Sequence, residues 1–149
     1  MLATDDKLTM YMYQADSLFG KWKLHKKSKV ITGSESRCGG RIFADNKGLL
    51  LSIQNASNGY GFGISLYRLN FKNGDYTLKR EKPFFLKKQE NIKEFNAGMH
   101  QLDIQQIGNK YYYVYDGNRL ASSQKIWNVK GALKMNYYDL KNWFYQNLN

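Results

Sequence analysis

The sequence predicts an all-β protein, folded as a two-layer antiparallel β-sandwich. Three observations support this fold class. Short runs rich in aromatic and β-branched residues alternate large and small side chains, as strands do. Pairs of asparagine, aspartate and glycine, which favour tight turns, separate these runs. The spacing of apolar residues that is typical of helices is scarce along the chain.

Turn signals set the boundaries of the expected strands. Asn73-Gly74 and Asp116-Gly117 are dipeptides that tolerate the positive φ of tight hairpin turns. Asn58-Gly59 and Gly108-Asn109 give similar signals. We therefore expect strands near residues 41–45, 48–54, 60–71, 75–81, 99–107, 110–115 and 119–124.

One expected strand has a bulky face and a nearly bare face. Within residues 60–67, large apolar side chains alternate with Gly61, Gly63, Ser65 and Tyr67. Bare positions let another backbone, an aromatic ring or a ligand approach closely. Close packing is a commoner reason for such positions than ligand binding.

The expected strand 110–115 contains four tyrosines. Tyr111, Tyr113 and Tyr115 share one face, whereas Tyr112 and Val114 share the other. Large groups cover both faces, and this predicts a central strand packed between another layer and an amphipathic environment.

The C-terminal segment, residues 132–148, fits two structures. Leu133, Tyr137 and Leu140 lie at spacings of four and three, as in an amphipathic helix. A turn around residues 136–139 would instead separate two strands, and we favour strands because the rest of the chain is β. The expected core comprises Phe62, Ile64, Leu66, Leu102, Ile104, Val114 and Trp143.

A chain of 149 residues is most simply one domain. We assign residues 16–149 to a single sandwich domain and residues 1–15 to an N-terminal extension. Cys38 is the only cysteine, so an intrachain disulfide is excluded. The chain has no apolar run of about 18 residues, which argues against a membrane-spanning helix. The location stays open: secreted or at the cell surface if a signal peptide precedes Leu2, and cytoplasmic otherwise.

Twenty-three basic residues against 12 acidic ones give a net charge of +11. Such a charge favours anionic partners, although it also fits a merely solubilising surface. The basic residues are densest between Lys21 and Lys47, and we expect the main cationic patch there.

The order of these segments resembles a known family. The runs "GYGFGIS", "NGDYTLKRE", "NAGMHQLDIQQIGNKYYYVYDGNRLAS" and "YYDLKNWFY" are similar to bacterial concanavalin A-like sandwiches, in particular laminin-G-like and 3-keto-disaccharide-hydrolase-like domains. The resemblance covers about residues 16–146 and implies a jelly-roll-like sandwich, with low functional specificity because that family includes lectins, adhesion modules and lyases. A lipocalin-like barrel is the alternative, since Gly20-Lys21-Trp22 resembles the opening of that family.

Motifs for catalysis are weak, so we do not favour an enzyme. His100 and Gln101 are adjacent and therefore point to opposite faces of a strand, unlike the paired residues of polyuronate lyases. No pair of carboxylates stands out for glycoside hydrolysis. His25 and His100 lie far apart in the sequence, and we expect neither a metal nor a cofactor.

The sequence-based hypothesis is a non-catalytic binding module for an anionic ligand, favoured as a carbohydrate-binding or adhesion module at the cell surface or outside the cell. The alternative is an inhibitor or immunity-type protein that docks an acidic protein through its basic face. Nucleic acid is a less favoured partner. The expected ligand-binding residues are Lys21, Trp22, Lys23, Lys26, Lys27, Arg37, Arg41, Tyr111, Tyr113 and Tyr115.

Overall fold

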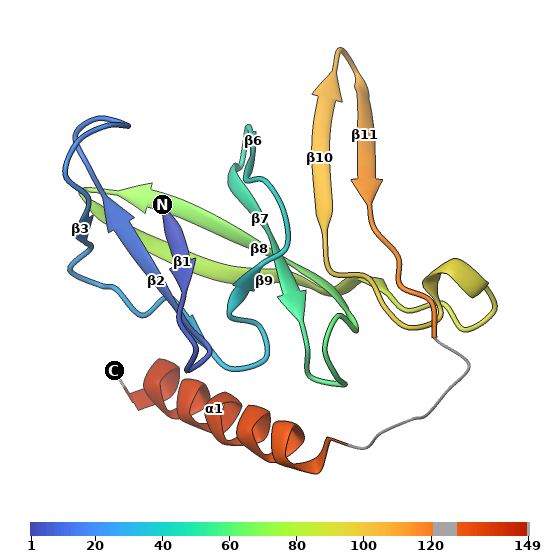
Figure 1. Cartoon of the computed structure of the whole chain (residues 1–149). Coiled ribbons are helices and arrows are strands. Elements are labelled where there is room, and N and C mark those ends of the chain that lie inside the picture. Colours follow the sequence, from blue (N-terminus) through green and yellow to red (C-terminus); the bar gives the residue numbers. More distant parts are fainter. Residues whose placement is uncertain (121–127, 149) are drawn as a thin grey trace.

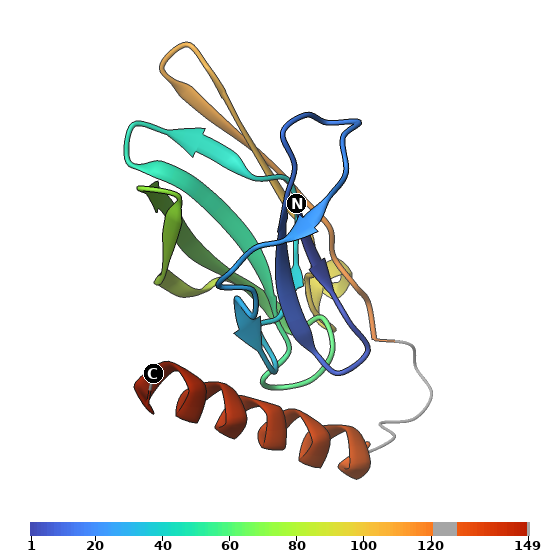
Figure 2. The ribbon, with the colours of Figure 1, turned by 90° about the vertical axis from the view of Figure 1, so that its left-hand side faces the viewer.

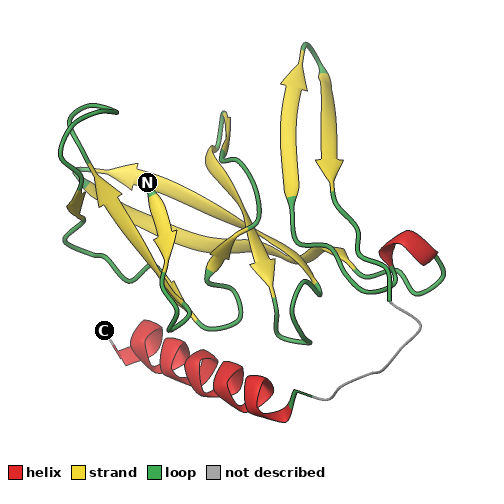
Figure 3. Ribbon diagram, in the orientation of Figure 1, coloured by secondary structure: helices red, strands yellow, loops and turns green. Residues whose placement is uncertain are grey.

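The computed structural model describes residues 1–120 and 128–148 and consists mainly of antiparallel strands (Figures 1 and 3). The largest sheet contains β7 (Gly48–Asn55), β8 (Gly63–Lys72) and β9 (Asp75–Lys87), and β5 (Arg37–Cys38) and β6 (Phe43–Asp45) both pair with β7. In the second sheet, β2 (Thr9–Gln14) pairs with β1 (Leu2–Thr4), β3 (Lys23–Leu24) and β4 (Ile31–Thr32). Strands β10 (Leu102–Ile107) and β11 (Lys110–Tyr115) form a separate hairpin, preceded by the 3-10 turn η1 (Lys93–Phe95).

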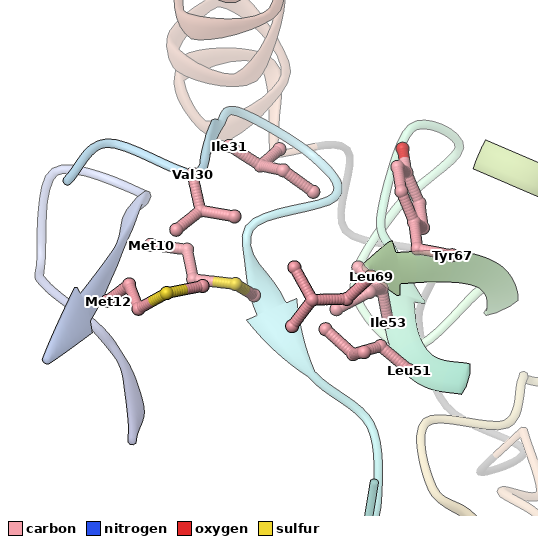
Figure 4. Close-up of a cluster of buried hydrophobic side chains, with 8 residues drawn as sticks. All are labelled: Met10, Met12, Val30, Ile31, Leu51, Ile53, Tyr67 and Leu69. Carbon is pink, nitrogen blue, oxygen red and sulfur yellow. The ribbon is translucent and has the colours of Figure 1, made fainter. Parts of the chain in front are cut away.

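The two larger sheets pack face to face, which confirms the antiparallel sandwich. Their shared cluster draws side chains from β2 and β4 on one side and from β7 and β8 on the other (Figure 4). Its buried members are Met10, Met12, Val30, Ile31, Leu51, Ile53, Tyr67 and Leu69. The described strands form open sheets that do not close, so the lipocalin-like alternative is wrong.

A second apolar cluster lies on the opposite face of β8. Ile64 and Leu66 pack there with Leu102 and Ile104 of β10, which confirms four of the predicted core residues. Strand β8 is therefore buried on both faces over residues 63–69. Close approach accounts for the bare position at Gly63, because a Cβ there would lie 2.4 Å from the carbonyl oxygen of Leu86.

The central strand is thus β8, and the prediction that residues 110–115 form one is wrong. Every residue of β11 is exposed, and within the described chain β11 pairs with β10 (Figure 1). Val114 is 72% exposed and Trp143 57%, so neither belongs to the core. The predicted strand 119–124 falls mostly on residues 121–127, which lie outside the described part of the chain, and residues 119 and 120 are not in a strand.

The C-terminal segment forms one helix, α1 (Val129–Leu148), so the preference for two strands is wrong. Asn128 caps it: its side-chain oxygen accepts a hydrogen bond from the backbone N–H of Gly131 at 2.8 Å. That bond satisfies an amide at the helix start that would otherwise have no partner. The helix lies beside the sandwich as a separate rod (Figures 1 and 2). None of the described helices is both long and apolar enough to span a membrane.

Candidate functional site

A cavity of about 480 Å³ separates helix α1 from the β8–β9 part of the large sheet. Its lining is mixed, with carboxylates, amides, a guanidinium, a phenol and an indole. Residues from the sheets and loops are Ser34, Glu35, Asn55, Ser57, Tyr67, Leu78, Arg80 and Phe84, and those from the helix are Asp139, Asn142, Trp143 and Gln146.

Glu35, which follows β4, is the centre of the hydrogen-bond network on the sheet side. Its Oε1 accepts hydrogen bonds from the Ser65 hydroxyl and from Asn55 Nδ2, the latter at 2.8 Å. Its Oε2 accepts from the Tyr67 hydroxyl at 2.6 Å and from an Arg80 guanidinium nitrogen at 2.9 Å. Four donors therefore surround a carboxylate that is 9% exposed, and they provide the partners that a buried charge requires.

The same contacts keep the neighbours of Glu35 in defined protonation states. Burial raises the pKa of Tyr67 far above its usual value, and the negative charge of Glu35 raises it further, so the phenol stays protonated. Burial lowers the pKa of Arg80, but the charges and hydrogen bonds of Glu35 and Tyr67 together outweigh burial and leave that pKa above its usual value. Arg80 therefore stays cationic while half of its side chain, 52%, remains exposed.

Helix α1 closes the other side of the cavity through three hydrogen bonds with the end of β4 and the loop that follows it. Asp139 Oδ1 accepts hydrogen bonds from the backbone N–H of Ser34 at 2.6 Å and from its hydroxyl at 3.0 Å. Asn142 Oδ1 accepts from the backbone N–H of Thr32 at 3.0 Å. These bonds attach the helix to the sheets through Asp139 and Asn142. Trp143, which follows Asn142, therefore also lines the cavity.

This arrangement suits a ligand with several hydroxyl groups. The lone pairs of Glu35 are occupied by four donors, so the carboxylate orients its neighbours and is poorly placed to accept a proton from a substrate. Arg80 carries further N–H donors and a positive charge that can meet a phosphate. Trp143 offers an apolar ring against which a sugar ring can lie. Among the described residues, no group of three histidine, cysteine or acidic side chains is arranged to hold a metal ion.

The residues predicted from the sequence lie elsewhere, and they do not form one surface. Lys21, Trp22, Lys23 and the neighbouring Lys26 and Lys27 lie around β3, at the end of the molecule opposite the β10–β11 hairpin (Figure 1). The Lys27 ammonium lies 2.7 Å from a carboxylate oxygen of Asp75.

The two predicted arginines lie closer to the hairpin. Arg37 is in β5, and the Nε of Arg41 lies 3.2 Å from a carboxylate oxygen of Asp103 in β10. The geometry thus separates Arg41 from the lysines near β3.

The predicted tyrosines share one face of β11 and contact rings of other elements. The ring centroid of Tyr111 lies 6.1 Å from that of Phe43, Tyr113 lies 6.0 Å from Phe85, and Tyr115 lies 5.7 Å from Phe95. These contacts attach the hairpin to β6, β9 and η1, so the three rings have a packing role whatever else they bind.

Sequence reasoning missed the cavity residues, although one signal pointed to them. Tyr67, which lines the cavity, and Ser65, which bonds to Glu35, both lie on the bare face of the run 60–67, where a ligand can approach closely. Glu35 is an acidic residue within the basic segment between Lys21 and Lys47, and no motif surrounds it. Its partners lie 20 to 45 residues away along the chain, and Asp139 lies 105 residues from Ser34, so pattern and spacing could not join them.

Comparisons with known proteins identify the chain's relatives. The family model of the N-terminal region of glucosamine inositolphosphorylceramide transferase 1 matches residues 2–118. A curated relative, glucosamine inositolphosphorylceramide transferase 1 of Arabidopsis thaliana, is 27% identical over 124 residues, which cover 79% of this chain and 16% of the relative. The chain thus spans about one sixth of the length of the relative that it matches. No solved structure matches the chain.

These findings overturn the functional hypothesis drawn from the sequence. The match is to part of a protein that is named as a transferase, so the prediction of a non-catalytic binding module, with its inhibitor or immunity-type alternative, is wrong. The resemblance to concanavalin A-like domains extends only to the coarse architecture, an antiparallel β-sandwich. Because the family model covers residues 2–118 of 149, the chain belongs to the family of the glucosamine inositolphosphorylceramide transferase 1 N-terminal region.

Proposed function

We propose that this chain takes part in glycolipid synthesis and contributes a substrate site to the transfer of a sugar to a phosphoinositol-bearing sphingolipid. The family match over residues 2–118 is the observation that carries the proposal. The relative's name contains an amino sugar and an inositolphosphorylceramide. Both present hydroxyl-rich rings, and the lipid headgroup adds a phosphate.

The cavity beside Glu35 and Arg80 is the proposed substrate site, because its chemistry fits these groups. Amide and phenol groups can exchange hydrogen bonds with ring hydroxyls, and Trp143 can pack against a ring face. The Arg80 guanidinium can pair with the phosphate, since it stays cationic and half exposed. Glu35 acts as a positioning residue that fixes Arg80 and Tyr67 before the substrate arrives.

The test is to replace Arg80 with glutamine in the native gene and to measure sphingolipids by mass spectrometry. A lost charge-assisted hydrogen bond costs about 1.5–3 kcal/mol, so the ratio of glycosylated to unglycosylated phosphoinositol lipid should fall on the order of tenfold or more.

Lys79→Gln is the matched control, because it removes the same charge from the neighbouring position of β9, on the opposite face of the strand. We expect it to leave the ratio unchanged. An Arg80→Gln protein that accumulates normally but leaves the lipid ratio at its original value would contradict the proposal.

A further inference from the structure

Helix α1 turns its apolar side away from the rest of the protein. Its sheet-facing side makes polar contacts, since Asn142 bonds to Thr32 at the end of β4 and Asp139 bonds to Ser34 just after it. The outer side carries an apolar stripe at spacings of three and four residues, and each member is between 46% and 73% exposed. The stripe consists of Val129, Leu133, Tyr137, Leu140, Phe144 and Leu148.

This orientation is the reverse of that in an ordinary surface helix, in which the apolar stripe faces the core. In both side views the helix runs along the lower edge of the molecule, with one long side facing away from the other described elements (Figures 1 and 2). Contiguous exposed apolar surface of this kind marks a site of interaction.

The charges beside the stripe indicate what covers it. Lys130, Lys134 and Lys141 lie along one flank of the stripe at the angles that their helical positions give. Lys134 also donates a hydrogen bond to the backbone carbonyl of Asp6 at 3.1 Å. Asp139 is the one acidic residue of the helix, and its carboxylate faces the protein. The outer side is therefore apolar with a purely cationic flank.

We infer that α1 docks, through this stripe, on the surface of an anionic lipid bilayer. An amphipathic helix with lysines beside an apolar face that carries Tyr and Phe rings is the type of helix that lies in a membrane interface. The stripe enters the boundary between headgroups and acyl chains, and the lysines meet the anionic headgroups. This inference rests on the helix alone and does not depend on the proposed sugar transfer.

The test measures co-sedimentation of the purified chain with phosphatidylcholine vesicles that contain or lack phosphatidylserine. We expect binding to the anionic vesicles that weakens with added salt. The double variant Leu140→Asn/Phe144→Asn should reduce the partition coefficient about tenfold or more, because two large apolar side chains no longer enter the interface. Leu18→Asn/Phe19→Asn is the matched control, since it makes the same kind of change at two exposed residues of the loop between β2 and β3. This variant should bind the vesicles normally.

A second pair of variants tests the charges. Lys130→Gln/Lys141→Gln should weaken binding about tenfold, and Lys79→Gln/Lys87→Gln, which removes the same total charge from β9, should have a much smaller effect. Circular dichroism checks that every variant keeps its secondary structure.

Three results would overturn the inference: no binding to anionic vesicles, equal binding to vesicles that lack phosphatidylserine, or equal losses in the helix variants and their controls. Light scattering would supply a fourth. A stable dimer that the Leu140→Asn/Phe144→Asn change dissociates would assign the stripe to a second copy of the chain instead. These results do not test the proposed function, which is tested separately by the cellular lipid ratio in the Arg80→Gln variant.

Discussion

Arg68 is a nearly buried cation held between two carboxylates. Its guanidinium lies 2.7 Å from a carboxylate oxygen of Asp45 and 3.0 Å from one of Glu81, and 10% of its side chain is exposed. Asp45 also accepts a hydrogen bond from the backbone N–H of Lys47 at 2.8 Å. Burial raises the pKa of Asp45, but the contacts with Lys47 and Arg68 outweigh it and leave the pKa below its usual value.

This lowered pKa predicts a pH-dependent contribution to stability. A carboxyl group whose pKa is lower in the folded state stabilises the fold above its unfolded pKa of about 4, and the contribution is lost as the pH falls through the folded value. Asp45→Asn should therefore cost about 1–2 kcal/mol at neutral pH and progressively less in acid. Urea unfolding at neutral and acidic pH measures both differences.

Asp103→Asn serves as the control at this scale. Asp103 pairs with Arg41 at 3.2 Å, and the two side chains are 38% and 60% exposed, so solvent screens their attraction. Its effect should be smaller than that of Asp45→Asn at neutral pH. A cost of Asp45→Asn that does not vary with pH would be evidence against the assigned role of its charge.

At the scale of elements, the cap of α1 decides where the helix begins. Replacing Asn128 by alanine removes the bond to the Gly131 amide and should destabilise the helix start by about 1 kcal/mol. Amide hydrogen exchange in residues 129–132 should then speed up while exchange in β7 and β8 stays the same. Asn136→Ala, inside the helix, is the control and should not raise the exchange rate at the helix start. Unaltered exchange in Asn128→Ala would mean that the helix begins without this cap.

Local signals explain which elements could be predicted from the sequence. Turn pairs such as Asn73-Gly74 act within a hairpin, so strands β6 to β11 could be predicted, although β9 continues to Lys87, beyond the predicted end at residue 81. The helical spacing of Leu133, Tyr137 and Leu140 is equally local, but the same segment also fits a turn around residues 136–139, and the β context of the chain favoured strands. Strands β1, β3, β4 and β5 contain only two or three residues each, so their sequence patterns are weak.

The candidate site was harder to predict because its members are distant in sequence. Glu35, Arg80 and Asp139 meet only after two sheets and a helix have packed together. The lysine-rich segment, by contrast, could be recognised from its composition alone. Composition does not show where these side chains lie relative to other residues in the fold. The proposed boundary between an extension at residues 1–15 and a domain at 16–149 stays a prediction, although β2 already supplies Met10 and Met12 to the core.

At the scale of the whole molecule, one strand joins the two apolar clusters. Ile104→Ala, at a residue that is 5% exposed in the cluster with Ile64 and Leu66, should cost about 2–5 kcal/mol. Because β8 belongs to both clusters, the loss should shift a single cooperative transition, with equal midpoints by tryptophan fluorescence and circular dichroism. Val114→Ala, at a 72% exposed residue, should leave the midpoint almost unchanged. Two separate transitions would show that the clusters unfold independently.

Because β8 contributes both to the apolar core and to the candidate site, the site depends on the correct pairing of this strand. Ile64 and Leu66 fill one cluster, while Ser65 and Tyr67, which alternate with them, donate hydrogen bonds to Glu35 on the other side. A slip of one residue in the pairing of this strand would exchange the two sets and leave a carboxylate facing apolar side chains. The hydrogen bonds that organise the cavity therefore also favour the native register of β8 over a register shifted by one residue.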